Sequence, residues 1–141
     1  MDDISRNIDQ RLREAYLATI YEVKYLGLHL QIGVENWDLE EFLIDNNAFS
    51  WAFISAWNPF SKPLSQSENN IRHSKLVDFA KKKHWVFAEG FGVPQNKDWD
   101  AEKSLFILDI SRNEAIHLGK KFDQKAIVIG RLGKAPELLF L

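Results

Sequence analysis

An apolar run that ends in a polar corner decides how this chain folds: residues 49–61 read FSWAFISAWNPFS. The alternating side chains are apolar in both sets, Ala52, Ile54 and Ala56 on one face and Trp51, Phe53 and Trp57 on the other. A strand that is apolar on both faces is covered on both, so it lies inside a sheet. Pro59 then stiffens the exit from the strand. A polar corner after a core strand is a place where α+β proteins often put a binding group.

Further strands and helices follow in both directions from this run. Core strands are predicted at 104–110 and 126–130, and further strands at 21–33 (one or two), 84–91 and 137–141. Apolar residues at helical spacing predict a helix over residues 3–20. Capping boxes of the S-x-x-E type predict helices that begin at Ser65 and Ser111, and Asp38 with Glu41 predicts a short helix in the same way. Residues 93–101 have the composition of a loop.

This order of elements predicts the fold class. Neighbouring strands without a helix between them argue against a purely parallel sheet. We therefore expect an α+β fold, in which about four helices pack on a single mixed, largely antiparallel sheet. The 141 residues fit one domain, residues 1–141, with the helix at 1–20 packed on it or flanking it. The residues expected to be largely buried are Phe53, Ile54, Phe106, Leu108, Phe122 and Ile127.

Composition excludes several classes of function. The net charge is −2, which is not the profile of a nucleic-acid or membrane-surface protein. The sequence has no cysteine, so thiolate chemistry and disulfides are absent. The four histidines are dispersed, and no metal site or cofactor is predicted. No apolar leader or membrane-spanning stretch is evident, so a cytoplasmic location is expected. The sequence does not indicate an oligomeric state.

The Asn-Pro corner supplies the first candidate ligand-binding residues, Asn58 and Ser61. Asn58 could present its amide to a ligand from the end of the strand. The alternative is a local turn in which the Asn58 side chain bonds backbone groups. Both interpretations stay open.

The helix that follows supplies the second pair, Asn69 and Arg72, which stand three residues apart and share a helix face. Arg72 could hold a carboxylate or a phosphate. The alternative is a structural ion pair between Arg72 and either Glu102 or Asp109.

Trp99, Glu102 and Gln124 complete the candidate set. Trp99 beside a carboxylate could stack on a flat ligand. If apolar neighbours remove water from Glu102, its pKa rises and it becomes a candidate general base, the one weak catalytic candidate in the chain. In the alternative, Trp99 has a structural role and packs against the sheet, and Glu102 forms an ion pair with Arg72. Gln124, at a helix-to-strand turn, could cap backbone groups or bind a ligand.

Several of these residues fall in a pattern that resembles a known family, the bacterial family catalogued as domain of unknown function 3293. The pattern consists of Ala56 to Ser61, Leu64, Ser65, Glu68, Asn69, Arg72, Leu76, Trp99, Glu102, Ser104, Ala115, Leu118, Phe122, Gln124, Ala126 and Ile127. The resemblance runs from about residue 19 to the C-terminus. The chain departs from it in two places: His73 stands where Asn is usual, and the segment 122–125 reads FDQK where FGQN is usual. The resemblance implies a fold and a residue set, and no reaction.

Three functions remain compatible with the sequence. The first is a small domain that binds a polar or anionic ligand, a nucleotide-like one included, at one end of the sheet. The second is an enzyme with Glu102 as general base and Arg72 as electrostatic stabiliser. The third is a protein-interaction module without a small ligand. Because no nucleophile or metal set is recognisable, the sequence favours binding over catalysis.

Overall fold

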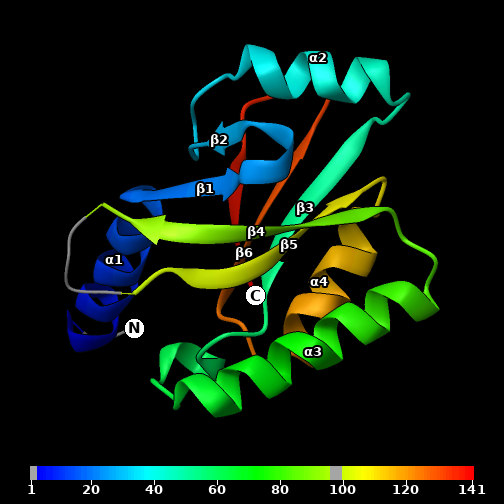
Figure 1. The fold of residues 1–141 in the computed structure, drawn as a ribbon. Coiled ribbons are helices and arrows are strands. Elements are labelled where there is room, and N and C mark those ends of the chain that lie inside the picture. The colour runs from blue at the N-terminus through cyan, green and yellow to red at the C-terminus, as the bar shows by residue number, and fades with distance from the viewer. Residues whose placement is uncertain (1–2, 96–99) are drawn as a thin grey trace.

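The protein folds around one curled sheet of seven strands, in the order β2-β1-β4-β5-β3-β6-β7 (Figure 1). The computed structural model describes residues 3–95 and 100–141, with side chains from residue 10 onward. The strands are β1 (Thr19–Val23), β2 (Leu28–Leu30), β3 (Ser50–Ser55), β4 (Phe87–Pro94), β5 (Glu102–Leu108), β6 (Ala126–Arg131) and β7 (Glu137–Phe140). Each described pairing is antiparallel. The α+β class is therefore confirmed, and the sheet is antiparallel rather than mixed.

Helices cover the two faces of the sheet unequally. They are α1 (Asp3–Leu17), α2 (Trp37–Asp45), α3 (Gln66–Lys82) and α4 (Arg112–Lys121). α3 and α4 lie together on one face, where their apolar side chains join Ile54, Leu105 and Ile107 in a buried cluster. The other face is concave because the β1–β2 hairpin curls over it, and α2 and α1 close its two ends (Figure 1). This concave face is where the cavity described below lies.

The middle of the sheet follows the sequence prediction. β3 lies between β5 and β6, so strands 50–55 and 102–108 are both internal, as their two-sided apolarity predicts. Trp51 stands opposite Gly130 on β6, and a Cβ atom at position 130 would lie 2.5 Å from the indole ring. The indole therefore needs a residue without a side chain as its neighbour across the strands.

Two of the three predicted helix starts are confirmed. Ser65 and Ser111 each cap a helix, with the reciprocal contact to Glu68 and Glu114 that defines the capping box. The start predicted at Asp38 is wrong: Asn36 caps α2, and its side chain accepts a hydrogen bond from Leu39 N. The Asn36 amide also donates to His29 O at 2.9 Å, which ties the helix start to β2. A cap of this kind is selected by a tertiary contact, so local spacing does not reveal it.

Other predicted boundaries also differ from the structure. The strand predicted at 104–110 runs from Glu102 to Leu108, since Asp109 adopts a left-handed φ of 53°. The helix predicted over 3–20 ends at Leu17, because the Thr19 hydroxyl donates back to Ala15 O at 2.7 Å and β1 begins there. The strand predicted at 84–91 is displaced to 87–94, since His84 adopts a left-handed φ of 57° at the end of α3. Residues 93 and 94, predicted as loop, therefore belong to β4.

The predicted core is largely confirmed. Phe53, Ile54, Phe106, Phe122 and Ile127 are buried, and Leu108 is half-buried. Within the described part of the chain, no helix combines the length and the apolar character that crossing a membrane requires.

Candidate functional site

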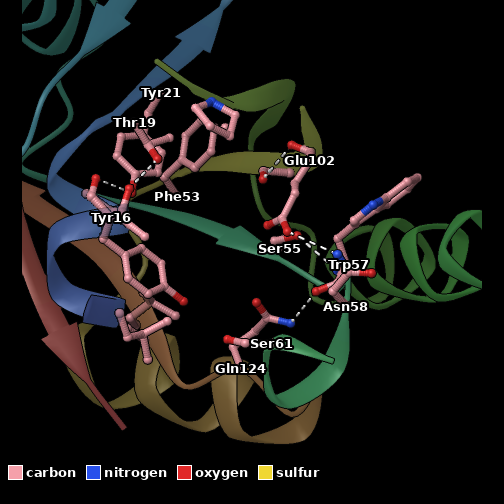
Figure 2. Close-up of a pocket in the computed structure, with 18 residues that line it drawn as sticks. Tyr16, Thr19, Tyr21, Phe53, Ser55, Trp57, Asn58, Ser61, Glu102 and Gln124 are labelled. Atoms are coloured by element: carbon pink, nitrogen blue, oxygen red, sulfur yellow. Dashed lines mark hydrogen bonds between the residues drawn. The ribbon is translucent and has the colours of Figure 1, made fainter. Parts of the chain in front are cut away.

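A cavity of about 100 Å³ opens on the concave face, between α1 and the ends of β1, β3, β4 and β5 (Figure 2). Aromatic side chains from three elements form much of its wall: Tyr16 on α1, Tyr21 on β1 and Phe53 on β3. Its polar lining comes from the Asn-Pro corner, β5 and the α4–β6 turn, through Asn58, Ser61, Glu102, Ser104 and Gln124. Segments far apart in sequence thus meet at one end of the sheet.

Asn58 is held in a strained conformation by its own side chain. Its φ is 47° and its ψ is 72°, in the left-handed region that Asn tolerates better than most residues. The side-chain Oδ1 accepts hydrogen bonds from Leu64 N at 3.0 Å and from Asn69 Nδ2 at 2.7 Å. Asn58 N in turn donates to Asn69 Oδ1 at 2.8 Å. Of the two interpretations left open above, the bonding to backbone is present, yet it leaves Nδ2 pointing at the cavity.

Glu102 is the acidic group of the cavity. It is partly buried, and its Oε1 accepts a hydrogen bond from Asn58 Nδ2 at 3.3 Å. Burial raises the pKa of the Glu102 carboxyl to about 7, and the Asn58 hydrogen bond opposes that rise only in part. The carboxyl is therefore poised between its acid and its ionised form near neutral pH.

Two tyrosines face this carboxyl from α1 and β1. Burial, followed by the repulsion of the nearby Glu102 charge, raises the pKa of Tyr16 to about 12. Burial also raises the pKa of Tyr21 far above its ordinary value, and its hydroxyl donates to Tyr16 O at 3.0 Å. Both phenols therefore keep their protons near neutral pH and add no charge to the cavity.

Gln124 forms the floor of the cavity. Its Nε2 donates to Trp57 O and to Phe122 O, each at 3.2 Å. Figure 2 shows its amide group beside Ser61, facing the space below Glu102. Of the two roles left open from the sequence, the capping of backbone groups is present. Gln124 also lines the cavity, and ligand binding by its amide stays a prediction.

Arg72 does not share this site, contrary to the prediction that it meets Asn58 and Glu102. Its Nε donates to Ala56 O at 2.7 Å and its NH2 group donates to Phe122 O at 2.5 Å. A looser ion pair joins it to Asp123 at 3.7 Å. The predicted pairs with Glu102 and Asp109 are not formed, and the guanidinium instead joins the end of β3 to the end of α4.

The remaining predicted residues divide between support and lining. Asn69 is buried and fixes Asn58, while Ser61 lines the cavity directly. Trp99 lies outside the described residues. Asp123, which stands where the resemblance implies Gly, has a φ of 59°, in the left-handed region that Gly adopts most readily.

Sequence reasoning missed the aromatic wall. Tyr16 lies in the helix predicted over 3–20 and Tyr21 in the strand segment predicted over 21–33, and neither stands in a motif that indicates a site. Only the pairing of β1 with β4, which sets Tyr21 opposite Gly92, brings these rings beside Glu102. Among the described side chains, no group of three or more histidines and carboxylates is arranged to hold a metal ion.

The fold and the site together define a small α+β domain with one acidic, aromatic-walled cavity. The chain belongs to the family described as "Protein of unknown function (DUF3293)", whose model matches residues 54–127, just over half of the chain. The matched segment is shorter than the resemblance suggested, and it contains Asn58, Glu102 and Gln124 but not α1 or β1. No curated protein and no solved structure matched the chain.

Proposed function

We propose that this protein binds a small organic molecule in the cavity between α1 and the sheet, with Glu102 as the principal polar contact. The observation that supports this most directly is a carboxyl group placed in an aromatic cavity with one neutral amide as its hydrogen-bond partner among the described residues. Burying a carboxylate with so little compensation costs stability. A ligand that offers hydrogen-bond donors would recover part of that cost.

The size and charge of the cavity narrow the ligand class. An engineered cavity of about 150 Å³ binds benzene, so a cavity of about 100 Å³ holds a molecule somewhat smaller. A whole nucleotide would not fit inside this volume and would have to extend out of the cavity mouth. The lining described contains no Lys, Arg or His, so an anionic ligand would meet Glu102 without a compensating cation. We therefore keep the prediction of a polar ligand. The described lining does not favour an anionic or a nucleotide-like ligand.

A fragment screen tests this function. Wild-type protein is titrated with neutral and charged compounds of up to about eight heavy atoms, and amide chemical shifts report the binding site. We expect shifts at Tyr21, Ser61 and Gln124, and their loss in Glu102→Gln. Glu35→Gln is the matched control, because Glu35 is exposed and the change in charge is the same. Absence of a cavity-directed hit from the whole screen would refute the proposal.

Catalysis with Glu102 as general base is the second candidate, favoured by the pKa of about 7. The sequence suggested Arg72 as the electrostatic stabiliser in this reaction. Its guanidinium instead donates hydrogen bonds to two backbone carbonyl groups. Fragments that bind are incubated with the protein in D₂O, and loss of C–H proton signals is followed by NMR. Exchange that requires Glu102 would support a base, and binding without exchange would support a binding domain.

A cytoplasmic location, a single domain and the absence of a nucleic-acid partner stay predictions from the sequence.

A further inference from the structure

Two acceptor groups of the cavity, the Gln124 amide oxygen and the Glu102 carboxylate, keep unused hydrogen-bonding capacity among the described residues. Gln124 shows this most clearly. Because its Nε2 donates to two carbonyl oxygens, a rotated amide would set oxygen against oxygen, so the orientation is fixed. Its Oε1 is then an acceptor for which the described residues provide no donor, and Figure 2 shows it turned towards the open space.

Glu102 adds a second set of acceptor sites. Asn58 Oδ1 already accepts from Leu64 and Asn69, so only its Nδ2 is left to face Glu102. A carboxylate has about four lone-pair sites, and this amide occupies one of them. Glu102 lines the cavity, and no other described group donates to its carboxylate, so acceptor capacity is left for a bound molecule.

The donors of the cavity are neutral hydroxyl groups, and no cation lines it among the described residues. The hydroxyls of Tyr16 and Ser61 line it and have no acceptor among those residues. The Ser55 hydroxyl is committed, since it donates to Lys103 O and accepts from Trp57 N. Lys103 itself reaches away to Asn70. The titratable groups that face Glu102 from the surrounding elements are Tyr16 on α1 and Tyr21 on β1, and both are neutral. The described part of the cavity thus has a negative group and no positive one.

Aromatic rings complete the pattern. Tyr16, Tyr21 and Phe53 line the cavity, and Tyr21 packs edge-on against Phe53 with ring centroids 5.2 Å apart. Aromatic faces attract organic cations, and the attraction is stronger where water is excluded. Such walls also suit the alkyl part of an amphipathic molecule.

We propose that the ligand of this cavity is a small alkylammonium ion, a protonated amine whose N–H groups are accepted by Glu102 and Gln124 Oε1. This inference rests on the proposed function and names its ligand class. The aromatic rings cover the alkyl chain and the positive charge. The cation also stabilises the ionised form of Glu102, so its binding at neutral pH displaces a proton from the carboxyl.

Three probes of equal length test the ligand class: n-propylammonium chloride, 1-propanol and sodium propionate. Each is titrated into wild-type protein at pH 8 while amide chemical shifts are followed. We expect n-propylammonium to bind at least about tenfold more tightly than 1-propanol, with propionate weakest. Because Glu102 is about ten times less ionised at pH 6 than at pH 8 for a pKa near 7, the affinity for the cation falls about tenfold between these values. The affinity for 1-propanol stays level.

The variants separate the possible explanations. Glu102→Gln should remove the preference for the cation, and Glu35→Gln should keep it. A measurement on wild type alone guards against misfolding of the variant: calorimetry at pH 7 in two buffers of different ionisation enthalpy should detect proton release with n-propylammonium. Nα-acetyl-lysine methylamide tests in parallel whether the ammonium at the end of a longer chain also enters.

The outcomes distinguish this inference from the function on which it rests. If 1-propanol or propionate binds as tightly as n-propylammonium at pH 8, or if no proton is released, the ammonium assignment is overturned while small-molecule binding stands. If neither these probes nor the fragment screen produces shifts at the cavity, both proposals fail.

Discussion

Glu102 gives the folded protein a pH dependence that can be measured without a ligand. Its pKa is raised from 4.5 to about 7, so the folded state binds the proton more tightly than the unfolded state does. The contribution of Glu102 to the free energy of unfolding therefore falls as the pH rises from about 4.5 to about 7, and is level above that. The full shift corresponds to about 3 kcal/mol.

Comparison of wild type with Glu102→Gln isolates this contribution. Urea unfolding at half-unit steps from pH 4 to 8 should show the variant gaining about 3 kcal/mol relative to wild type across that interval, with Glu35→Gln parallel to wild type. A difference between wild type and Glu102→Gln that does not change with pH would mean that Glu102 has an ordinary pKa.

Arg72 belongs to the stability of the fold rather than to the ligand. Arg72→Ala removes donors from Ala56 O and Phe122 O, both carbonyls of buried residues, and should lower the free energy of unfolding by about 2–4 kcal/mol. Arg112→Ala is the control, since its pair with Glu137 is exposed and 3.8 Å long. Equal, small losses in both variants would contradict this role, as would loss of fragment binding by Arg72→Ala at unchanged stability.

Pairing of β3 with β6 depends on the contact between Trp51 and Gly130. Gly130→Ala places a methyl group 2.5 Å from the indole and should cost about 1–3 kcal/mol in chemical denaturation. Gly92→Ala is matched to it, because Gly92 is also a strand residue but its added Cβ would have no neighbour closer than 3.6 Å. If the two variants lose the same stability, backbone preference rather than packing explains the effect.

The elements show which features local sequence predicts and which it does not. The starts of α3 and α4 follow from two S-x-x-E patterns, and the internal places of β3 and β5 follow from apolarity on both faces. Each of these signals lies within a stretch of a few residues, so local sequence is enough to read it. The cap at Asn36 and the end of α1 near Thr19 depend instead on the neighbouring strands.

Local sequence likewise predicts part of the candidate site and not the rest. Asn58, Glu102 and Gln124 converge because each stands beside a strand end, which local patterns reveal. The separation of Arg72 from them was not predictable, since a long side chain on the expected helix face reached two carbonyl groups instead. The tyrosines could not be assigned either, because their place depends on the register between β1 and β4.

Across the protein, stability should be greatest at the middle of the sheet. β3 and β5 each have a strand on both sides, whereas β2 and β7 form the two edges. Amide hydrogen exchange should therefore be slowest in β3 and β5, where it requires global unfolding, and fastest in β2. Protection of β7 equal to that of β3 would mean that the edge is covered by a partner in solution.

The Asn-Pro corner has a consequence for the chemical ageing of the protein. Asparagine deamidates when the backbone nitrogen of the next residue attacks the side-chain amide. Pro59 has no N–H with which to complete that ring closure. The amide of Asn58, whose conversion to a carboxylate would set a second negative charge against Glu102, is thereby protected by its own neighbour. Peptide mass spectrometry after prolonged incubation at alkaline pH should find Asn58 intact, even where asparagines with other neighbours have converted.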